Sequence, residues 1–320
     1  MTAKKTWTIH PREIQEELFP SGFPSSPCPE LTVLSFGAGQ DSTALLYLLG
    51  NDQELRKVFA PKDLIVIFSD TGAEHEETYS EALPVAMSFC ADMRIPFYWL
   101  RPGSEYHSKS WPSLIDHYRR TGTCGSRGFP RSCTDQLKIR PFYRFLEEYL
   151  GTTYQVEIGR KKGFYEYARH YGKLRVLIGL TAEESGRCQE KSRPLWMRRC
   201  IDIRYPLQEM RATRSDAQTI ITGYGYRVPC PSSCRCCPFL TLRDLLWKYR
   251  TRPEEYEELL CLENTKLSRF EHLGEKNYGV YGAMRLPQAL TKAEHLFGHL
   301  SNSELTEARQ RDGHGVRSKY

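Results

Sequence analysis

Residues 31–49, with the sequence LTVLSFGAGQDSTALLYLL, decide the fold of this 320-residue chain. Residues 31–36 form a short apolar run of strand length, and Gly37 and Gly39 then interrupt it. The tripeptide Asp-Ser-Thr at 41–43 is typical of a helix start, and another apolar run follows it. A strand that enters a helix through glycines brings free N–H groups and the positive end of the helix dipole to one point, which favours a phosphate. The stretch therefore predicts a strand, a phosphate-binding turn and a helix.

Three further apolar runs have the length of buried strands. They lie at 64–68, 97–100 and 175–180, and helical patterns separate them, whereas 104–128 is rich in turn-forming residues and is expected to be loop. This alternation predicts an α/β fold with a parallel sheet and right-handed crossovers. The expected parts of the chain are an extended lead-in at 1–30, a domain built around the phosphate turn at 31–212, and a mostly helical, cysteine-containing region at 213–320.

Composition and charge narrow the class of protein. The sequence has no apolar run long enough to span a bilayer and no secretory leader after its charged N-terminus, so we expect a cytoplasmic protein without a membrane partner. Its 11 cysteines cannot all pair, and clustered cysteines in a reducing compartment more often bind metal or do redox chemistry. The net charge is +6, yet residues 157–214 hold 14 basic and 7 acidic residues, a local charge of +7. An anionic partner is therefore expected at that segment.

Two common phosphate loops do not fit residues 37–42. A Walker A loop needs a lysine, which this turn lacks, and the third glycine and the downstream acidic residue of a dinucleotide fingerprint are not cleanly placed. The turn resembles the PP-loop, S-G-G-x-D-S, of the ATP pyrophosphatases, enzymes that cleave ATP between the α and β phosphates. Here it reads GAGQDS, so Gly37 replaces the first serine and Ala38 the first glycine. We expect the nearby Ser35 to supply the missing hydroxyl.

Polar residues follow two other predicted strands. Asp70 and Thr71 come directly after the strand at 64–68, and the sequence TAEESGR at 181–187 follows the strand at 175–180. The carboxyl ends of parallel strands meet at one edge of a sheet, where such folds bind ligands. A carboxylate at that edge can accept a hydrogen bond from a ribose hydroxyl or bind Mg²⁺ through water.

Residues 228–239, VPCPSSCRCCPF, contain the main cluster of cysteines. Cys234 and Cys237 form a C-x-x-C pair, a spacing that brings two thiolates to one tetrahedral metal or to two corners of an iron–sulfur cluster. Cys230 precedes the pair by four residues. The candidates for a further ligand are Cys124, Cys133 and Cys236. Spacing alone does not choose between Zn²⁺ and a [4Fe–4S] cluster.

These motifs stand in a recognisable order. Over about residues 31–265 the chain resembles the phosphoadenylyl-sulfate (PAPS) reductase-like branch of the PP-loop, or adenine nucleotide alpha hydrolase, superfamily. The matching motifs are GAGQDST at 37–43, FSDTGAEHEETY at 68–79, the C-x-x-x-x-K-I-R-P stretch at 133–141, GLTAEESGR at 179–187, YPL at 205–207, and S-x-C-x-x-C-P-F at 232–239. The resemblance implies a Rossmann-like sheet, a bound adenine nucleotide such as ATP, and often a [4Fe–4S] cluster.

The resemblance also implies roles for single residues. Those expected to bind the nucleotide are Ser35, Gly37, Gly39, Gln40, Asp41, Ser42, Thr43, Asp70, Thr71, Arg140 and Glu183. Those expected to take part in catalysis are Asp41, Ser42, Lys138 and Arg187. The expected cluster ligands are Cys133, Cys230, Cys234 and Cys237. Thr134 stands where a typical reductase carries the second of two paired cysteines, which is a departure from the family pattern.

The end of the chain departs further from the true reductases. PAPS and adenylyl-sulfate reductases use a mobile cysteine near the C-terminus, whose thiolate is the nucleophile that takes the sulfonate. After Cys261 this chain has no cysteine. Classical sulfonucleotide reduction is therefore disfavoured.

The leading hypothesis is ATP-dependent activation followed by sulfur transfer. A substrate oxygen attacks the α-phosphorus of ATP and pyrophosphate leaves, with Mg²⁺ and basic side chains stabilising the charge. Sulfur from a persulfide or through the cluster then displaces AMP. Residues 160–173 alternate basic and aromatic side chains, which suits tRNA or DNA as the acceptor. An amphipathic helix whose aromatic residues pack inward explains the same pattern.

Two alternatives belong to other classes of function. In the first, the altered PP-loop binds a nucleotide but scarcely cleaves it, and the chain is an accessory subunit of a bacterial defence or CRISPR-type assembly. In the second, the chain is a PAPS or adenylyl-sulfate reductase that uses an external thiol. The leading hypothesis adds one further partner, a sulfur-donor protein.

Overall fold

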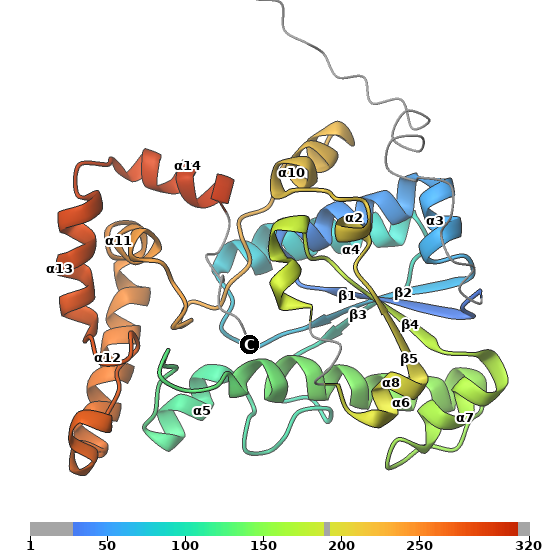
Figure 1. Cartoon of the computed structure of the whole chain (residues 1–320), viewed down its shortest axis with the longest axis horizontal. Helices are drawn as coiled ribbons and strands as arrows, with labels where there is room; N and C mark the ends of the chain where they lie inside the picture. The colour runs from blue at the N-terminus through green and yellow to red at the C-terminus, as the bar shows by residue number, and fades with distance from the viewer. Residues whose placement is uncertain (1–27, 189–192, 313–320) are drawn as a thin grey trace, which may run out of the picture.

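A computed structural model describes residues 28–188 and 193–312 of the chain. The strands in this part form one parallel sheet in the order β3–β2–β1–β4–β5 (Figure 1). They are β1 (Leu31–Phe36), β2 (Asp63–Ser69), β3 (Phe97–Leu100), β4 (Leu174–Ile178) and β5 (Ile201–Arg204). β1 is central, and its Val33 is in register with Ile65 of β2 and Val176 of β4. The predicted α/β fold with a parallel sheet is confirmed, and β5 adds an edge strand that the sequence pattern did not reveal.

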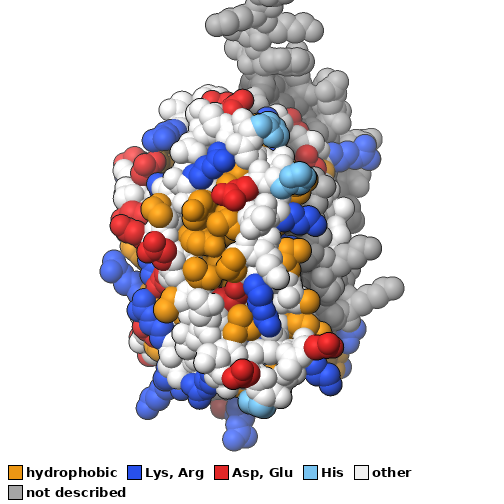
Figure 2. All heavy atoms as spheres, turned by 90° about the vertical axis from the view of Figure 1, so that its left-hand side faces the viewer, with side chains coloured by type: hydrophobic (Ala, Val, Ile, Leu, Met, Phe, Trp, Pro, Cys, Tyr) orange, Lys and Arg blue, Asp and Glu red, His pale blue; other side chains and the backbone are white. Residues whose placement is uncertain are grey.

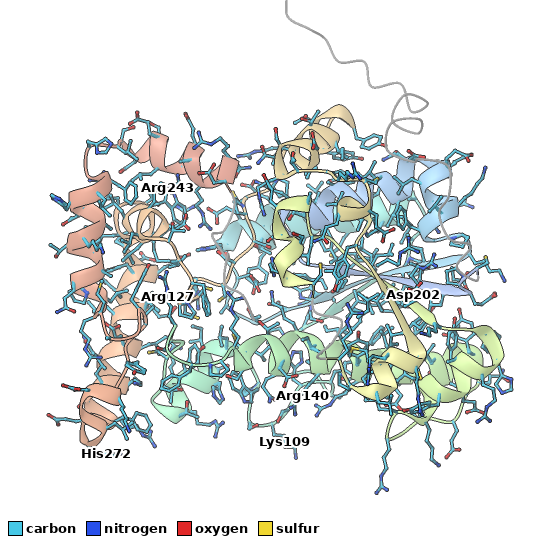
Figure 3. All side chains as sticks on the ribbon, in the orientation of Figure 1. Lys109, Arg127, Arg140, Asp202, Arg243 and His272 are labelled. Carbon is cyan, nitrogen blue, oxygen red and sulfur yellow. The ribbon has the colours of Figure 1, made fainter. Side chains whose placement is uncertain are left out.

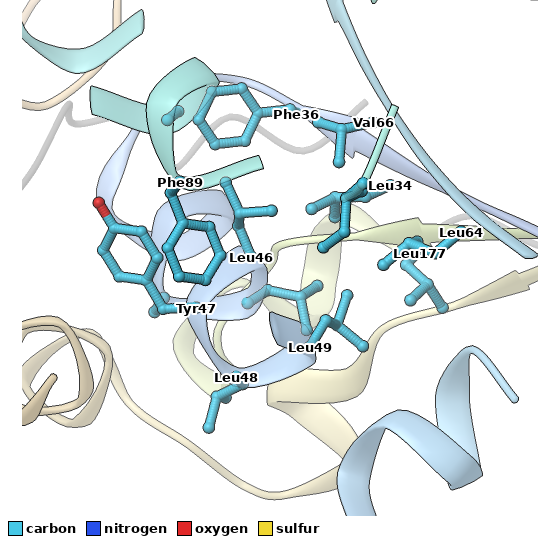
Figure 4. Close-up of a cluster of buried hydrophobic side chains, with 14 of the residues drawn as sticks. Leu34, Phe36, Leu46, Tyr47, Leu48, Leu49, Leu64, Val66, Phe89 and Leu177 are labelled. Carbon is cyan, nitrogen blue, oxygen red and sulfur yellow. The ribbon is translucent and has the colours of Figure 1, made fainter. Parts of the chain in front are cut away.

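Helices cover both faces of the sheet (Figure 1). Because side chains alternate along a strand, Leu34 of β1 packs on one face with α2 (Gln40–Asn51), and Leu31 packs on the other with α6 (Arg140–Tyr154). The first face also carries α3 (Gln53–Phe59), α4 (Leu83–Asp92), α9 (Pro206–Glu209) and α10 (Arg214–Gly223), and the second carries α7 (Lys162–Tyr171) and α8 (Leu195–Cys200). Figure 4 shows the first core, in which strand and helix side chains interdigitate. Burial on both faces explains the nearly continuous apolar sequence of β1.

Residues 104–128, expected to be loop, contain a helix. α5 (Leu114–Thr121) begins at Ser113, whose hydroxyl accepts a hydrogen bond from the backbone N–H of Asp116. The helix ends at Gly122, which adopts a left-handed conformation with φ 57°. The turn-forming residues of this segment therefore include the two caps of a short helix. Other short helical segments differ from α-helices in their hydrogen-bond spacing. η1 (Thr78–Ala82) and η2 (Thr134–Ile139) are π-helices, and η3 (Ala182–Arg187) and η4 (Glu271–Lys276) are 3₁₀-helices.

The C-terminal helices lie beyond the carboxyl ends of the strands, at the left of Figure 1. They are α11 (Leu242–Thr251), α12 (Pro253–Arg269), α13 (Leu286–Phe297) and α14 (Asn302–Asp312). Figure 2 looks onto the molecule from this side and shows hydrophobic side chains grouped between charged ones. α10 instead packs against α2, on the first face of the sheet. In the part that the structure describes, no helix is long and apolar enough to cross a membrane.

Candidate functional site

The sheet has its topological switch point between β1 and β4. From β1 the chain moves outward through β2 to β3, and it then returns to the other side of β1 with β4 and β5. The loops that leave β1 and β4 therefore diverge, and the crevice between them is where such folds bind ligands. The loop after β1 holds the phosphate turn at 37–39, and the loop after β4 holds residues 179–187. Two of the stretches that the sequence singled out thus meet at this position.

The phosphate turn is held in shape by Ser42. The Ser42 hydroxyl accepts a hydrogen bond from the Gly37 N–H at 3.2 Å and donates one to the Gly39 carbonyl at 3.1 Å. Ala38 has φ 55°, a left-handed conformation that residues with a side chain rarely adopt. α2 then begins at Gln40 without a side-chain cap. The first N–H groups of α2 thus lack a side-chain partner, which is an arrangement that a bound anion completes.

Gly179 brings the loop after β4 into contact with the phosphate turn. A Cβ atom at this position would lie 2.7 Å from the backbone nitrogen of Ser42 and 2.8 Å from its Cα. These contacts are too short for any side chain, and the atoms on the other side belong to the backbone of α2 and cannot swing aside. Only glycine therefore allows β4 to approach the first turn of α2 this closely.

Asp41 is the centre of a buried cluster of charges. Its carboxylate lies 3.4 Å from the Arg214 guanidinium, and Glu184 lies beside the same arginine at 3.7 Å. Burial raises the pKa of Asp41 to about 7; Arg214 opposes this shift and Glu184 adds to it. Arg187 pairs with Glu184, and Glu183 accepts a hydrogen bond from the backbone N–H of Arg214. Among the described residues, the Oδ1 atom of Asp41 has no hydrogen-bond partner. Three separate elements thus place a carboxyl group that changes charge near neutral pH beside the phosphate turn.

The side chain of Gln40 points away from the phosphate turn and bonds with other parts of the chain. Its Nε2 donates to the carbonyl oxygens of Pro229 at 3.2 Å and Gln310 at 2.9 Å, and its Oε1 accepts from Gln218 at 2.9 Å. Both N–H bonds of the amide are used, so the side chain fastens α10, α14 and the stretch around Pro229 to the start of α2. Two further residues that the resemblance assigned to the nucleotide are Thr43, which is buried in the first turn of α2, and Ser35, which lies within β1.

Asp70 is fully engaged within the protein. One carboxylate oxygen accepts hydrogen bonds from the Gly72 N–H at 2.7 Å and the Tyr79 hydroxyl at 2.8 Å, and the other accepts from the Trp99 indole at 3.0 Å. Three donors on one buried carboxylate hold the loop after β2 in a single shape. Asp70 thus lies at the expected strand end, and its carboxylate accepts three hydrogen bonds within the protein.

Lys138 connects the loop after β2 with the cysteines. Its ammonium group lies 3.1 Å from the carboxylate of the buried Glu74, which also accepts a hydrogen bond from Thr71 at 3.0 Å. Burial opposes the charge on Lys138, but Glu74, with the thiols of Cys234 and Cys133, raises its pKa above the ordinary value. The lysine therefore stays cationic next to two thiols.

Arg140, which the resemblance assigned to the nucleotide, lies outside this group. It is exposed at the start of α6 and pairs with Asp135 at 2.7 Å. Figure 3 shows Arg140 and Lys109 on the lower side of the molecule. The sequence pattern places Arg140 two residues from Lys138, but on a helix this spacing turns the two side chains to different sides.

The basic segment at 157–214 is only partly available to a polyanion. α7 turns Phe164 and Tyr167 into the core, where both are fully buried. Arg175 is also buried, in an ion pair within the sheet. The aromatic residues of α7 that remain exposed are Tyr165 and Tyr171. Inward packing therefore accounts for half of the aromatic residues in this pattern, and the other half stays exposed.

Residues 228–239, here called the cysteine segment, cross the ends of β1 and β2. At its start, Ser232 lies against Gly39, where a Cβ atom would be 2.6 Å from the serine hydroxyl oxygen. Further along, an antiparallel bridge joins Cys234 to Glu74. The segment thus covers the phosphate turn and then passes to the loop after β2, where Glu74 pairs with Lys138.

Three of the four cysteines expected as cluster ligands come together. The Cys237 N–H donates to the Cys234 carbonyl at 3.1 Å, which closes the C-x-x-C turn. Burial raises the pKa of Cys133, and the neighbouring Cys237 adds to the shift, whereas Arg131 and Lys138 oppose it. A hydrogen bond with the buried Cys236 raises the pKa of Cys234. Cys133 and Cys234 are therefore neutral thiols, and the cations Arg131 and Lys138 lie beside Cys133.

Cys230 does not join this group. It is exposed, and the charges that act on it come from Glu77 and Arg309, among others. The reason lies in its neighbour Pro229, whose carbonyl oxygen is held by the side chains of Gln40 and Gln310. Within residues 28–188 and 193–312, no three His, Cys, Asp or Glu side chains are spaced to hold a metal ion. The ligand set implied by the resemblance is thus not assembled in this geometry.

Sequence reasoning did not single out Arg214. It is the first residue of α10, directly after Thr213, which forms a capping box with Asp216. The T-x-x-D pattern marks the helix start, and this signal was available. The pairing with Asp41 spans 173 positions of the chain, and no local pattern encodes such a contact.

Comparison with known proteins finds a solved structure that is similar to this chain. No protein-family model matches the sequence, and a search of curated proteins finds no match either. Among solved structures, the chain is similar to the U34-tRNA thiolase NcsA from Methanococcus maripaludis with its [4Fe–4S] cluster. The match has 14% sequence identity, covers 91% of this chain and 79% of that chain, and has a TM-score of 0.41.

Proposed function

We propose that this protein binds ATP at the phosphate turn and activates an acceptor by adenylation, with release of pyrophosphate, for sulfur transfer to a nucleic acid. One observation carries the proposal: three features meet at the switch point of the sheet. They are the uncapped first turn of α2, the charged cluster around Asp41, and the cysteine segment that crosses the turn. The N–H groups of the first turn of α2 can bind phosphate, and the charged cluster can stabilise the charge that develops during phosphate transfer. The cysteine segment brings thiols to the same edge of the sheet. The PP-loop resemblance of residues 37–42 supports the same assignment.

The charged side chains suit attack at the α-phosphorus. The N–H groups of α2 would hold phosphate oxygens, and Arg214 with Arg187 would stabilise the negative charge of the transition state. An acceptor oxygen forms the new bond to the α-phosphorus, the bond to the bridging oxygen breaks, and pyrophosphate leaves with the electron pair. Mg²⁺ that accompanies ATP takes oxygen ligands, and Oδ1 of Asp41 is an oxygen of this kind.

The second step exchanges oxygen for sulfur without a net change in oxidation state. The sulfur of a hydrosulfide ion forms a bond to the activated carbon, the carbon–oxygen bond breaks, and AMP carries the oxygen away. The hydrosulfide proton goes to the acceptor or to solvent. Lys138 would hold the anion beside the thiols of Cys133 and Cys234. A [4Fe–4S] cluster or Zn²⁺ held by Cys133, Cys234 and Cys237 would supply a further site for sulfide.

The test is the formation of AMP and pyrophosphate from ATP and Mg²⁺, with and without tRNA, other single-stranded RNA or DNA. We expect release that increases with one of these acceptors. Arg214→Met should lower the rate about a hundred-fold, because it removes a group that stabilises transition-state charge. Arg227→Met is the matched control, since Arg227 is 84% exposed and should leave the rate unchanged.

The same assay separates the alternatives. ATP binding without AMP or pyrophosphate under any condition contradicts the enzyme and supports the accessory subunit of a defence-type assembly. That alternative is favoured by Gly37 and Ala38, which replace residues of the PP-loop pattern, and by the ion pair that already engages Asp41. Sulfite formed from PAPS and reduced thioredoxin would instead identify a reductase with an external thiol.

A further inference from the structure

A pocket of about 200 Å³ borders the thiols and has no part in the chemistry described above. It lies between α5, the loop at 122–133 and the end of the cysteine segment, and Cys133 forms part of its wall. The residues that line the pocket include Trp111, Tyr118, Phe129, Arg131, Cys133 and Phe239.

The walls of the pocket are flat and aromatic. The Trp111 and His117 rings stack with centroids 3.4 Å apart and an angle of 10° between their planes. The Arg131 guanidinium lies 3.8 Å from the centroid of the Phe239 ring. Phe129 is 49% exposed, which is high for a side chain of this kind. Aromatic rings and guanidinium planes bind flat, polar-edged rings by stacking.

The pocket is held open by contacts with the C-terminal part. The Ser126 hydroxyl donates to the Gly279 carbonyl at 2.6 Å, and the Arg127 N–H donates to the Val280 carbonyl at 3.0 Å. The Arg127 side chain donates from Nε to the Pro238 carbonyl at 2.8 Å, so it joins the loop to the end of the cysteine segment (Figure 3). A pre-formed pocket loses little free energy to reorganisation when a ligand enters.

The size and surroundings of the pocket restrict its ligand. Pockets for drug-sized ligands are about 300–1,000 Å³, so this pocket accepts one ring system and not a whole nucleotide. Burial lowers the pKa of Arg131, and the charge of Arg187 acts in the same direction. Lys109 and Arg120, next to Trp111 and on α5, are exposed cations that can contact phosphates outside the pocket.

We infer that this pocket takes one unstacked base of a single-stranded nucleic acid and holds its edge beside Cys133. The base belongs to the acceptor of the proposed function, so the inference rests on that function for the reaction, though not for binding. Proteins that act on a base, or read one in a single strand, hold it between aromatic and arginine faces and contact its edge with polar groups. Phosphates on either side stay in solvent, where the exposed cations lie.

Photochemical cross-linking locates the base directly. The probes are a short single-stranded RNA and a DNA of the same sequence, each with one 5-iodouracil, irradiated with the full-length protein and mapped by peptide mass spectrometry. We expect adducts on Trp111, Tyr118, Phe129 or Phe239. Adducts confined to α7 or to another surface, or no adduct with either probe, overturn the inference. The more reactive of the two probes identifies the class of nucleic acid.

Affinity measurements test the stacking. Phe129→Ala should weaken binding of the better probe about five- to hundred-fold, and Phe129→Tyr should restore it, because a ring is sufficient for stacking. Tyr224→Ala, at a partly exposed tyrosine on the first face of the sheet, should leave binding unchanged. Unaltered binding by Phe129→Ala overturns the inference.

Competition with ATP separates the inference from the proposed function. If ATP displaces the probe from Phe129, the pocket holds adenine, and the inference is wrong while the function stands. If ATP is never cleaved but Phe129→Ala still loses affinity for the probe, the inference stands and the function is wrong. Thermal melting of each variant confirms that it is folded.

Discussion

At the scale of single residues, the site depends on a glycine, Gly179, as much as on its polar side chains. Gly179 has the backbone of α2 within 2.7 Å of the position of a Cβ atom, whereas nothing lies within 4 Å of such an atom at Gly186 in the same loop. Gly179→Ala should therefore push β4 away from the phosphate turn and weaken ATP binding at least ten-fold. Gly186→Ala is the matched control. Isothermal titration with ATP measures both, and equal affinity for the two variants would contradict the role given to Gly179.

The titration of Asp41 gives a prediction with a definite sign. Because burial raises its pKa from 3.8 to about 7, the folded protein binds a proton between these values that the unfolded chain does not bind. Stability therefore falls as pH rises through this window. Asp41→Asn removes the titrating group, so it should melt at a higher temperature than the parent at pH 8, with a smaller difference at pH 5. The variant should also lose pyrophosphate release. Asp92→Asn, at an exposed position, should show no such pattern.

Single residues were predicted by type and position but not by what they contact. The sequence places Asp41 at the start of the helix that follows the first strand and Asp70 after the end of the second strand, where the structure also has them. Only Asp41 keeps an unused oxygen, because the donors that occupy Asp70 and the carbonyls that hold Gln40 come from other elements. The Gln310 partner of Gln40 lies 270 positions away, and no local pattern indicates it.

At the scale of elements, a buried ionic group ties α11 and α12 to the loop after β2. Lys248 is completely buried and pairs with Glu255, which also lies 3.0 Å from Nδ1 of His75. Burial opposes the charge on Glu255, but His75 and Lys248 lower its pKa to about 2. Each charged member therefore depends on the others for compensation.

Lys248→Met should destabilise the protein by about 3–5 kcal/mol, because it leaves a partly buried carboxylate without its cation. The double variant Lys248→Met/Glu255→Gln should recover most of the loss, since it removes both charges. Urea unfolding measures the free energies, with Lys292→Met at an exposed position as control. A double variant no more stable than the single one would show that the lysine acts through packing and not through charge.

The strands could be predicted from the sequence where helices bury them on both faces of the sheet. β1, β2 and β4 are mostly apolar because helices cover both faces of the sheet, and such runs stand out in the sequence even though β4 includes the buried Arg175. β5 and α5 did not stand out. β5 is short and half-buried at a sheet edge, and α5 is a short helix whose caps are also turn-forming residues.

At the scale of the whole molecule, the cysteine segment connects the two halves of the chain. It runs from the phosphate turn, past the end of β2, to the pocket walled by Phe239. The C-terminal helices therefore lie at the same edge of the sheet as the candidate site. The sequence indicates the sheet and the cysteines separately, but their meeting depends on long-range contacts such as that between Cys234 and Glu74.

This arrangement leads to a prediction about metal. Metal binding needs thiolates, and Cys133 and Cys237 converge beside Lys138 and Arg131, whereas Cys230 is held apart. We expect anaerobically purified protein to contain iron or zinc, and Cys133→Ser and Cys237→Ser to lose it. Metal analysis and the visible absorption spectrum measure the content and distinguish the two metals.

Cys230→Ser then decides between the two ligand sets. If Cys133, Cys234 and Cys237 hold the metal without Cys230, this variant keeps the metal, as does Cys261→Ser, at an exposed cysteine on α12. If Cys230→Ser loses as much as Cys237→Ser, the start of the cysteine segment must move towards Lys138, which requires release of the Pro229 carbonyl from Gln40 and Gln310. Gln40→Ala would then raise metal affinity, because it removes one of the two bonds that hold this end of the segment over the phosphate turn. Cys230→Ser and Gln40→Ala together therefore show whether metal and ATP bind to the same conformation of the cysteine segment.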